Sequence, residues 1–224
     1  MRRFADRAAA GRQLAKALVD AVPVDGGVVL GLPRGGVPVA AEVARALGLP
    51  LDVVCVRKLG VPFHPELAMG AIASGGAVVR NEDVLETLSP SEAEFDRVLG
   101  EERDELERRE RCFRGAEPAL DVWGRHVIVV DDGLATGATM AAAVRALRSL
   151  APADLVVAVP VGSREAVARI EEIADRVVCL HAPMYFGAVG SFYESFDQTS
   201  DEEVRELLAA ARERHARKGG PADA

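Results

Sequence analysis

The sequence has few aromatic residues, few cysteines and no long apolar run. Aromatic side chains make up 4% of the 224 residues, so the core must be aliphatic. The three cysteines, Cys55, Cys112 and Cys179, lack the spacing of a metal site, and we expect unpaired thiols in a reducing compartment. No stretch approaches the roughly 18 apolar residues of a transmembrane helix. The first residues lack the apolar segment of a signal peptide, so we expect a cytoplasmic protein.

An excess of basic residues is also missing. Lysine and arginine total 27 against 35 acidic residues, which gives a formal net charge of −8. Proteins that bind nucleic acid through its phosphates usually carry the opposite balance. We therefore expect neither a nucleic-acid nor a membrane partner, and any anionic ligand must be bound locally by a shaped site.

Short apolar runs alternate with helical patterns along most of the chain. The apolar runs are typical of buried strands and lie at 28–32, 51–56, 127–130, 155–161 and 177–180. Helical spacing of apolar residues predicts helices at 4–21, 37–47, 91–114, 139–150, 163–173 and 200–217. Uninterrupted apolar strands that alternate with helices favour an α/β fold, with a parallel sheet covered by helices on both faces.

The chain is long enough for one domain, and we expect a single domain over residues 1–224. An N-terminal helix (1–22) precedes the core (26–183), and a small hood with a C-terminal helix follows at 184–217. Ser200, with Glu203 three residues later, predicts the N-cap of that last helix.

Two segments between the predicted strands have loop or turn chemistry. Gly60, Pro62 and Pro65 predict a flexible loop over 59–67. The runs at 68–73 and 77–80 flank Ser74-Gly75-Gly76 and predict a hairpin.

Unusual residues follow three of the predicted strands. Pro33-Arg34-Gly35-Gly36 follows the first, Arg57-Lys58 follows the second, and Asp131 to Thr139 follows the third. Ligands of open parallel sheets bind beyond the carboxyl ends of the strands. We therefore expect these three loops to converge on one site.

The loop after residue 130 combines two acids with glycine and hydroxyl residues. Gly133 and Gly137 permit backbone geometries that point successive N–H groups inward, and Thr136 and Thr139 add hydroxyl groups. Such a nest at a helix N-terminus suits a monophosphate. The adjacent acids would repel a phosphate, and they suit sugar hydroxyls or a metal ion. Together they describe a site for a ribose 5-phosphate.

Other nucleotide-binding loops fit this segment less well. A P-loop needs a lysine after its last glycine, and none follows Gly137. A dinucleotide fingerprint places its acid well after the glycines, whereas here the acids come first. A plain strand-to-helix turn capped by Thr136 or Thr139 explains neither the paired acids nor their place after a buried strand.

The run Val127-Ile128-Val129-Val130-Asp131-Asp132-Gly133-Leu134-Ala135-Thr136-Gly137-Ala138-Thr139 resembles the phosphoribosyl-pyrophosphate motif of the type I phosphoribosyltransferases. Gly31–Gly36 is similar to the pyrophosphate loop of that family. Val56-Arg57-Lys58-Leu59-Gly60 is similar to the segment before its flexible catalytic loop, and these motifs look most like the adenine enzyme. The resemblance spans about residues 28–162, and it implies the type I fold with a flexible loop or hairpin and a C-terminal hood.

The resemblance assigns the substrate phosphoribosyl pyrophosphate to these loops. Asp131 and Asp132 would hold the ribose 2- and 3-hydroxyls. The 5-phosphate would lie in the loop formed by Gly133, Leu134, Ala135, Thr136, Gly137, Ala138 and Thr139. The backbone amides of Arg34, Gly35 and Gly36 would hold pyrophosphate, in a loop where the family often has a non-proline cis peptide.

The resemblance also implies the catalytic groups. Arg57 and Lys58 would neutralise the leaving pyrophosphate, assisted by a substrate-bound Mg²⁺ ion that bridges pyrophosphate and ribose hydroxyls. A loop over 59–76 would close on the site to exclude water. His64 in that loop would contact pyrophosphate or accept a proton, as would Glu66, although a solvated histidine among prolines is the alternative.

The hood would complete the site. Tyr185 or Phe186 would stack on the base, unless these rings only pack locally. Val189-Gly190 followed by Glu194 resembles the oxopurine enzymes, where the later acid meets magnesium. The candidate metal ligands are therefore Asp131, Asp132 and Glu194.

The activity implied is Mg²⁺-dependent transfer of the 5-phosphoribosyl group to a nitrogenous base or another small nucleophile, with release of pyrophosphate. The oxopurine enzymes carry an acid where this chain has Ala135, which argues against hypoxanthine and guanine. The adenine enzyme has a lysine in place of Val61.

Two other functions use the same fold. One is a regulator that binds phosphoribosyl pyrophosphate or a nucleotide without catalysis, and the other is hydrolysis of a phosphoribosyl compound. The negative charge and the lack of an added DNA-binding domain argue against the regulator. A homodimer stays open as an assembly.

Overall fold

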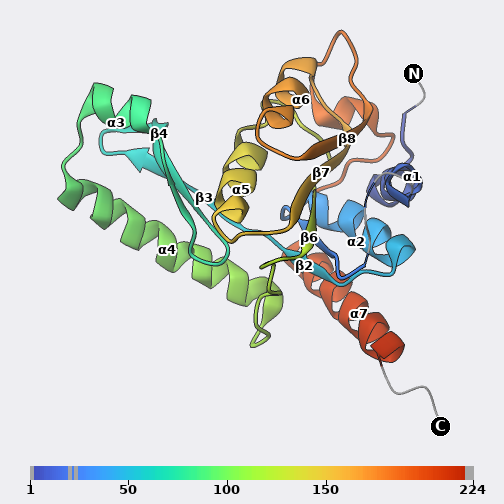
Figure 1. Cartoon of the computed structure of the whole chain (residues 1–224). Coiled ribbons are helices and arrows are strands. Elements are labelled where there is room, and N and C mark those ends of the chain that lie inside the picture. The colour runs from blue at the N-terminus through green and yellow to red at the C-terminus, as the bar shows by residue number, and fades with distance from the viewer. Residues whose placement is uncertain (1–2, 20–21, 23–24, 220–224) are drawn as a thin grey trace.

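A five-stranded parallel sheet forms the centre of the protein, in the strand order β2-β1-β6-β7-β8 (Figure 1). The computed structural model describes residues 3–19, 22 and 25–219. The strands are β1 (Val28–Gly31), β2 (Leu51–Val53), β6 (His126–Val130), β7 (Asp154–Val161) and β8 (Arg176–His181).

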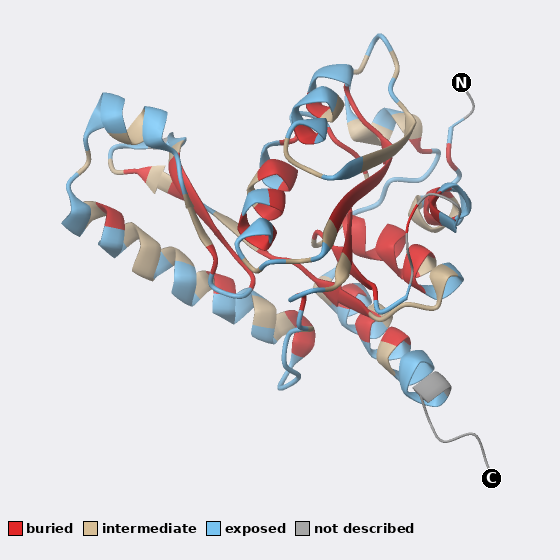
Figure 2. Ribbon diagram, in the orientation of Figure 1, coloured by how far each residue is buried: buried red, intermediate tan, exposed pale blue. Residues whose placement is uncertain are grey.

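Helices cover both faces of this sheet, which confirms the predicted fold class. Val28 and Leu30 of β1 pack on one face with α5 (Ala138–Arg148) and α6 (Arg164–Glu171). Val29 faces the other way, toward α1 (Arg7–Val19) and α2 (Gly36–Leu47). Successive side chains of a strand point to opposite faces, so a strand buried on both sides must be apolar throughout. Figure 2 shows this burial along the strands and the inner helix faces.

A second sheet of three antiparallel strands lies beside the first (Figure 1). It consists of β3 (Val56–Val61), β4 (His64–Ala73) and β5 (Val78–Arg80). The hairpin predicted around residues 74–76 joins β4 and β5. The loop predicted over 59–67 is wrong, because β3 and β4 pair directly across a turn at Pro62 and Phe63. Irregular pairing at Gly60 accommodates the proline-rich stretch, since proline is tolerated at turns and bulges.

Two helices join this second sheet to the rest of the chain. The helix α3 (Glu82–Leu88) was not anticipated from the sequence. The long charged helix α4 (Glu92–Arg114) begins after Ser91, whose side chain and that of Glu94 form a reciprocal capping box. Apolar residues of α4 pack against the face of the second sheet formed by Leu59, Met69 and Ile72.

A buried ion pair fixes the end of α4 to the parallel sheet. Arg114 Nε donates to Asp52 Oδ1 at 2.7 Å, and both side chains are 5% exposed or less. Arg114 also donates to the carbonyl of Val53, and the amide of Leu120 donates to Asp52 Oδ2. The two sheets are therefore joined by charged groups whose hydrogen bonds are mutually satisfied.

The chain ends differ in part from the sequence expectations. The first helix starts at Arg7 rather than Phe4, because Phe4 forms a β-bridge with Tyr193. Residues 20 and 21, at the predicted end of this helix, lie outside the described residues. The last helix, α7 (Asp201–Gly219), has the predicted cap, with the Glu203 amide donating to Ser200 Oγ at 3.0 Å. None of the described helices is long and apolar enough to span a membrane.

Candidate active site

The loops that follow β1 and β6 meet at the carboxyl ends of their strands. A Cβ on Gly36 would lie 2.7 Å from the carbonyl oxygen of Val130, and one on Gly35 would collide with the Asp132 carboxylate. Only glycine allows this approach. The peptide bond between Pro33 and Arg34 is cis, as the family resemblance implied.

The amides of the first loop are not equivalent. Gly36 N–H donates to Leu32 O at 3.0 Å, so this amide is already used within the protein. The amides of Arg34 and Gly35 have no acceptor among the described residues. The Arg34 side chain reaches Asp201 at the start of α7, at 3.3 Å. Of the three amides assigned to pyrophosphate, two are available for a ligand.

The acid pair at the end of β6 is crowded and poorly solvated. The Asp132 amide donates to Asp131 Oδ1 at 2.8 Å. Burial raises the pKa of Asp131 well above its usual value, and the neighbouring Asp132 raises it further. Burial also raises the pKa of Asp132, against a lowering contribution from Arg7. Carboxylates held this way release little hydration when a sugar hydroxyl or a cation binds them.

Arg7 is a site residue that the sequence analysis missed. Its Nε lies 2.8 Å from Asp132 Oδ2, and the two side chains are 13% and 14% exposed. Its Nη1 donates to Asp197 O at 2.6 Å, and its guanidinium lies 3.9 Å from the centre of the Phe196 ring. An arginine at the start of a polar N-terminal helix gives no sequence signal of this contact, because the partner lies 125 residues away.

The hood segment (residues 184–199) closes over the same acid. Tyr193 donates its hydroxyl to Asp132 O at 2.6 Å and packs against Phe4 and Phe196. Arg7 and the hood therefore fix the backbone and one carboxylate oxygen of Asp132, and Oδ1 accepts no hydrogen bond from the described residues.

Hydrogen bonds with β7 and with residues at and within α6 hold the predicted 5-phosphate loop in place. Leu134 is buried, and its amide donates to Val161 O at 2.9 Å. Ser163 Oγ donates to Ala135 O at 2.8 Å, and Arg169 Nη1 donates to Thr136 O at 3.1 Å. Gly137, with φ +73°, then turns the chain into α5.

These contacts use carbonyl groups and leave donors free. Among the described residues, the amides of Ala135, Thr136, Gly137 and Thr139 have no acceptor. Free N–H groups at a helix N-terminus are the geometry that binds phosphate. The loop therefore has the donors that the sequence analysis expected.

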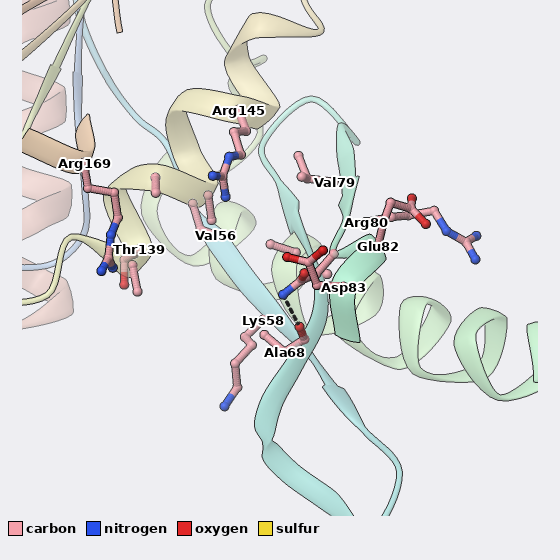
Figure 3. A pocket seen from close by; sticks show the side chains of 16 residues that line it. Val56, Lys58, Ala68, Val79, Arg80, Glu82, Asp83, Thr139, Arg145 and Arg169 are labelled. Atoms are coloured by element: carbon pink, nitrogen blue, oxygen red, sulfur yellow. Dashed lines mark hydrogen bonds between the residues drawn. The ribbon is translucent and has the colours of Figure 1, made fainter. Parts of the chain in front are cut away.

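A cavity of about 780 Å³ opens beside this loop, between α5 and the second sheet (Figure 3). Thr139, Arg145 and Arg169 line one side of this cavity (Figure 3). Lys58 on β3, and Glu82 and Asp83 on α3, line the other side (Figure 3). Small and apolar residues complete the wall, namely Val56, Ala68, Gly70, Ala71, Val79, Ala138, Ala141 and Ala142.

Arg57 and Lys58 do not sit together at the rim as expected. They are adjacent on β3 and point to opposite faces of the second sheet. Arg57 Nε pairs with Glu102 of α4 at 2.6 Å, whereas Lys58 lines the cavity beside α5. The loops after β1 and β6 therefore meet as expected. The third segment contributes only Lys58, which faces the cavity that the 5-phosphate loop also lines.

The remaining predicted residues lie at the edges of the site. His64 and Glu66 are exposed on β4, with Nδ1 and Oε1 3.6 Å apart. Tyr185 is 88% exposed, while Phe186 stacks on Phe192 at 5.2 Å between ring centres. Their assigned roles stay predictions.

The donor set at the acid pair suits a magnesium ion that also binds its substrate. Within the described residues, no three His, Cys, Asp or Glu side chains gather as a metal site. Glu194 is exposed, its amide donates to Phe4 O, and its role at a metal stays a prediction. Mg²⁺ commonly uses one or two carboxylates together with phosphates and water. Asp131 and Asp132 supply carboxylate oxygens of that kind.

Comparison with known proteins identifies the family. Residues 4–194 match the phosphoribosyl transferase domain. The chain belongs to this family. The match covers both loops, the acid pair and the hood up to residue 194.

Several proteins are similar to this phosphoribosyl transferase domain. A Mycobacterium tuberculosis (strain H37Rv) protein named as a phosphoribosyl transferase is 48% identical over 219 residues. These residues are 98% of this chain and 49% of that protein, so the chain spans about half the length of the curated relatives it matches. The crystal structure of TT1426 from Thermus thermophilus is 45% identical with a TM-score of 0.84, covering 93% of this chain and 98% of that one. A ribose-phosphate pyrophosphokinase of Methanosarcina mazei is 49% identical over 53 residues, 23% of this chain and 18% of that protein.

Proposed function

We propose that the protein transfers the 5-phosphoribosyl group of phosphoribosyl pyrophosphate to a nitrogenous base or another small nucleophile. The observation that carries this proposal is the junction of three groups at one sheet edge. The free amides of Arg34 and Gly35, the carboxylates of Asp131 and Asp132, and the free amides of the 5-phosphate loop are adjacent there. The free amides of that loop belong to Ala135, Thr136, Gly137 and Thr139. Anion, diol and phosphate sites in that order match the substrate from pyrophosphate to 5-phosphate.

The chemistry follows from where charge develops. The bond between the anomeric carbon and the pyrophosphate oxygen breaks, and its electron pair leaves with pyrophosphate. The acceptor's lone pair forms the new bond to the same carbon. Amides of the loop after β1 stabilise the leaving anion, and the acid pair holds the ribose hydroxyls beside a sugar that becomes cationic. A bound Mg²⁺ ion would add positive charge to the pyrophosphate, with Asp131 and Asp132 as its protein ligands.

Arg7 sets the charge of the diol site. Two neighbouring carboxylates without a counter-charge would repel the doubly phosphorylated substrate. Arg7 at 2.8 Å from Asp132 offsets negative charge on that carboxylate and leaves Asp132 Oδ1 for the ligand. The same guanidinium contacts Phe196 and Asp197, so the diol site and the hood share one anchoring side chain.

The acceptor we propose is adenine or a non-purine nucleophile. Ala135 is exposed and carries no group that could hold or take a proton from an oxopurine. General acid–base help of that kind typically contributes about 10²–10⁴-fold in rate. Hypoxanthine and guanine should therefore turn over poorly.

One observation favours a second function, non-catalytic binding of phosphoribosyl pyrophosphate or a nucleotide. Arg57 is paired with Glu102 rather than directed to the leaving group. A regulator would keep the binding loops and dispense with that cation.

One assay separates these functions. The protein is incubated with phosphoribosyl pyrophosphate, Mg²⁺ and a panel of bases, and pyrophosphate and nucleotide are both measured. Acceptor-dependent release of both products supports the transferase. Release without an acceptor indicates hydrolysis, and tight binding without release indicates the regulator. The control is the Asp131→Asn, Asp132→Asn variant.

A further inference from the structure

The cavity beside α5 contains cations that have no acidic partner. Among the described residues, Lys58 donates a hydrogen bond only to the Glu66 carbonyl at 3.3 Å, Arg169 donates only to Thr136 O, and Arg145 has no hydrogen bond or ion pair. Arg80, which also lines the cavity, pairs instead with Glu92. Unpaired cations gathered around a concave site in a protein of net charge −8 indicate an anionic ligand.

The position of the cavity limits which part of a ligand it can hold. Ala138 and Thr139, from the 5-phosphate loop, line it, whereas the acid pair and the loop after β1 do not. It therefore continues from the phosphate end of the ribose site, away from the carbon at which transfer occurs. An acceptor bound there would lie on the wrong side of the sugar.

The wall of the cavity leaves room for a chain of phosphates along α5. Ala138, Ala141, Ala142 and Arg145 are spaced by three and four residues, which places them on one helix face. The alanines leave the first turns open, and the guanidinium of Arg145 extends from the next turn (Figure 3).

The wall opposite α5 includes two acidic side chains. Glu82 and Asp83 lie across the cavity from Arg145, near β4 and α3 (Figure 3). These carboxylates would repel an anion, so the negative groups of a ligand belong on the side of α5, where Arg169 also lies, while Lys58 lines the cavity from β3.

We propose that this cavity binds the outer phosphates of a nucleoside 5′-di- or triphosphate, whose innermost phosphate occupies the loop of residues 133–139. Because that loop is part of the proposed function, the inference rests on it. Such nucleotides compete with phosphoribosyl pyrophosphate, and they bind more tightly than the corresponding monophosphates.

Calorimetric titration tests the proposal. Mono-, di- and triphosphates of adenosine and guanosine, and phosphoribosyl pyrophosphate, are titrated into the full chain without Mg²⁺, which would mask the phosphate charge. We expect at least one triphosphate to bind about tenfold or more tightly than its monophosphate, because charged hydrogen bonds are stronger than neutral ones. Arg145→Gln should reduce this ratio severalfold without changing the affinity for the monophosphate, since Lys58 and Arg169 remain.

Arg176→Gln is the matched control, since Arg176 is exposed, lies outside the cavity and has no hydrogen bond or ion pair among the described residues. It removes the same charge and should keep the wild-type ratio. Equal binding of mono- and triphosphate, or a ratio that survives Arg145→Gln, overturns the inference alone. If neither the monophosphates nor phosphoribosyl pyrophosphate bind, the proposed function fails with it.

Discussion

The edge of the parallel sheet and the second sheet hold their charged groups in different ways. At the edge, Asp132 is fixed through its carboxylate by Arg7 and through its carbonyl by Tyr193. On the second sheet, Lys58 is exposed, and within the part of the chain that the structure describes its ammonium donates only to a carbonyl oxygen. The first arrangement is preorganised before a ligand arrives, while the second has cations free to rearrange around one.

Adjacent residues on β3 show the same difference on a smaller scale. Arg57 points to α4, where Glu102 neutralises it, and Lys58 points to the cavity beside α5. Side chains alternate between the faces of a strand, so neighbouring cations reach different surroundings. Of these two neighbouring cations, Lys58 is therefore available to a ligand, whereas Arg57 is neutralised within the protein.

The largest expected effect comes from removing the acid pair. Asp131→Asn with Asp132→Asn keeps the shapes but removes the charges that accept the ribose hydroxyls. At about 1.5–3 kcal/mol for each charged hydrogen bond, affinity for phosphoribosyl pyrophosphate should fall at least about 100-fold. Calorimetry measures the loss, and retained affinity would show that the pair is structural.

The buried ion pair of Arg114 with Asp52, which fixes α4 to the parallel sheet, should have the next largest effect, and this effect is on folding stability. Arg114→Ala leaves Asp52, which is 3% exposed, as a buried charge without its partner. We expect a loss of about 3–5 kcal/mol in the free energy of unfolding, measured by urea denaturation. Arg111→Ala, which among the described residues breaks only the exposed pair with Glu107, should cost less than about 0.5 kcal/mol. Equal effects of the two variants would contradict a special role for the buried pair.

Arg7 should have an intermediate effect. Arg7→Gln removes the counter-charge of Asp132 and its contacts to the hood, and we expect about 1–3 kcal/mol of destabilisation. It should also weaken binding of phosphoribosyl pyrophosphate, and Arg7→Lys should recover part of both losses. Arg12→Gln on the same helix is the control, because Arg12 is 52% exposed and lies 3.9 Å from its partner Glu42. If Arg12→Gln loses as much stability and binding as Arg7→Gln, the contact of Arg7 with Asp132 does not account for the effect.

The acid pair should make the folding stability of the protein fall as the pH rises. The folded protein raises the pKa of Asp131 above its usual value of 3.8, so the folded state binds a proton more tightly than the unfolded state. Stability from this group is present below pH 3.8 and is lost as the pH rises through the raised pKa. Asp131→Asn should therefore gain stability relative to wild type from acid to neutral pH. Melting temperatures across this range check the trend, and a difference that shrinks with pH would contradict it.

The smallest effect is on cysteine reactivity. Burial raises the pKa of Cys55, where the sheets join, to about 12, and that of Cys179 on β8 to about 11. Both thiols are protonated at pH 8 and should react slowly with iodoacetamide, because the thiolate is the nucleophile. Mass spectrometry of labelled peptides should find Cys112 modified first. Early modification of Cys55 would mean that the junction between the sheets opens readily.

Several features of the fold could be predicted from local patterns. The parallel sheet follows from apolar strands such as Val127–Val130, and the cap of α7 follows from Ser200 and Glu203. The loop predicted over 59–67 is wrong because turn residues such as Pro62 also occur at the tip of a hairpin. Only the pairing with β4 shows that β3 continues to Val61.

The sequence by itself determined the order of binding loops, because the acids, glycines and hydroxyls of 131–139 lie together in the chain and their chemistry is local. Only the tertiary structure decided which charges remain free. Arg7 lies 125 residues from Asp132, and Arg57 lies 45 residues from Glu102. Ion pairs between such distant residues depend on how helices dock on the sheets, and no local pattern encodes that docking. The cavity that joins Lys58, Arg145 and Arg169 arises for the same reason.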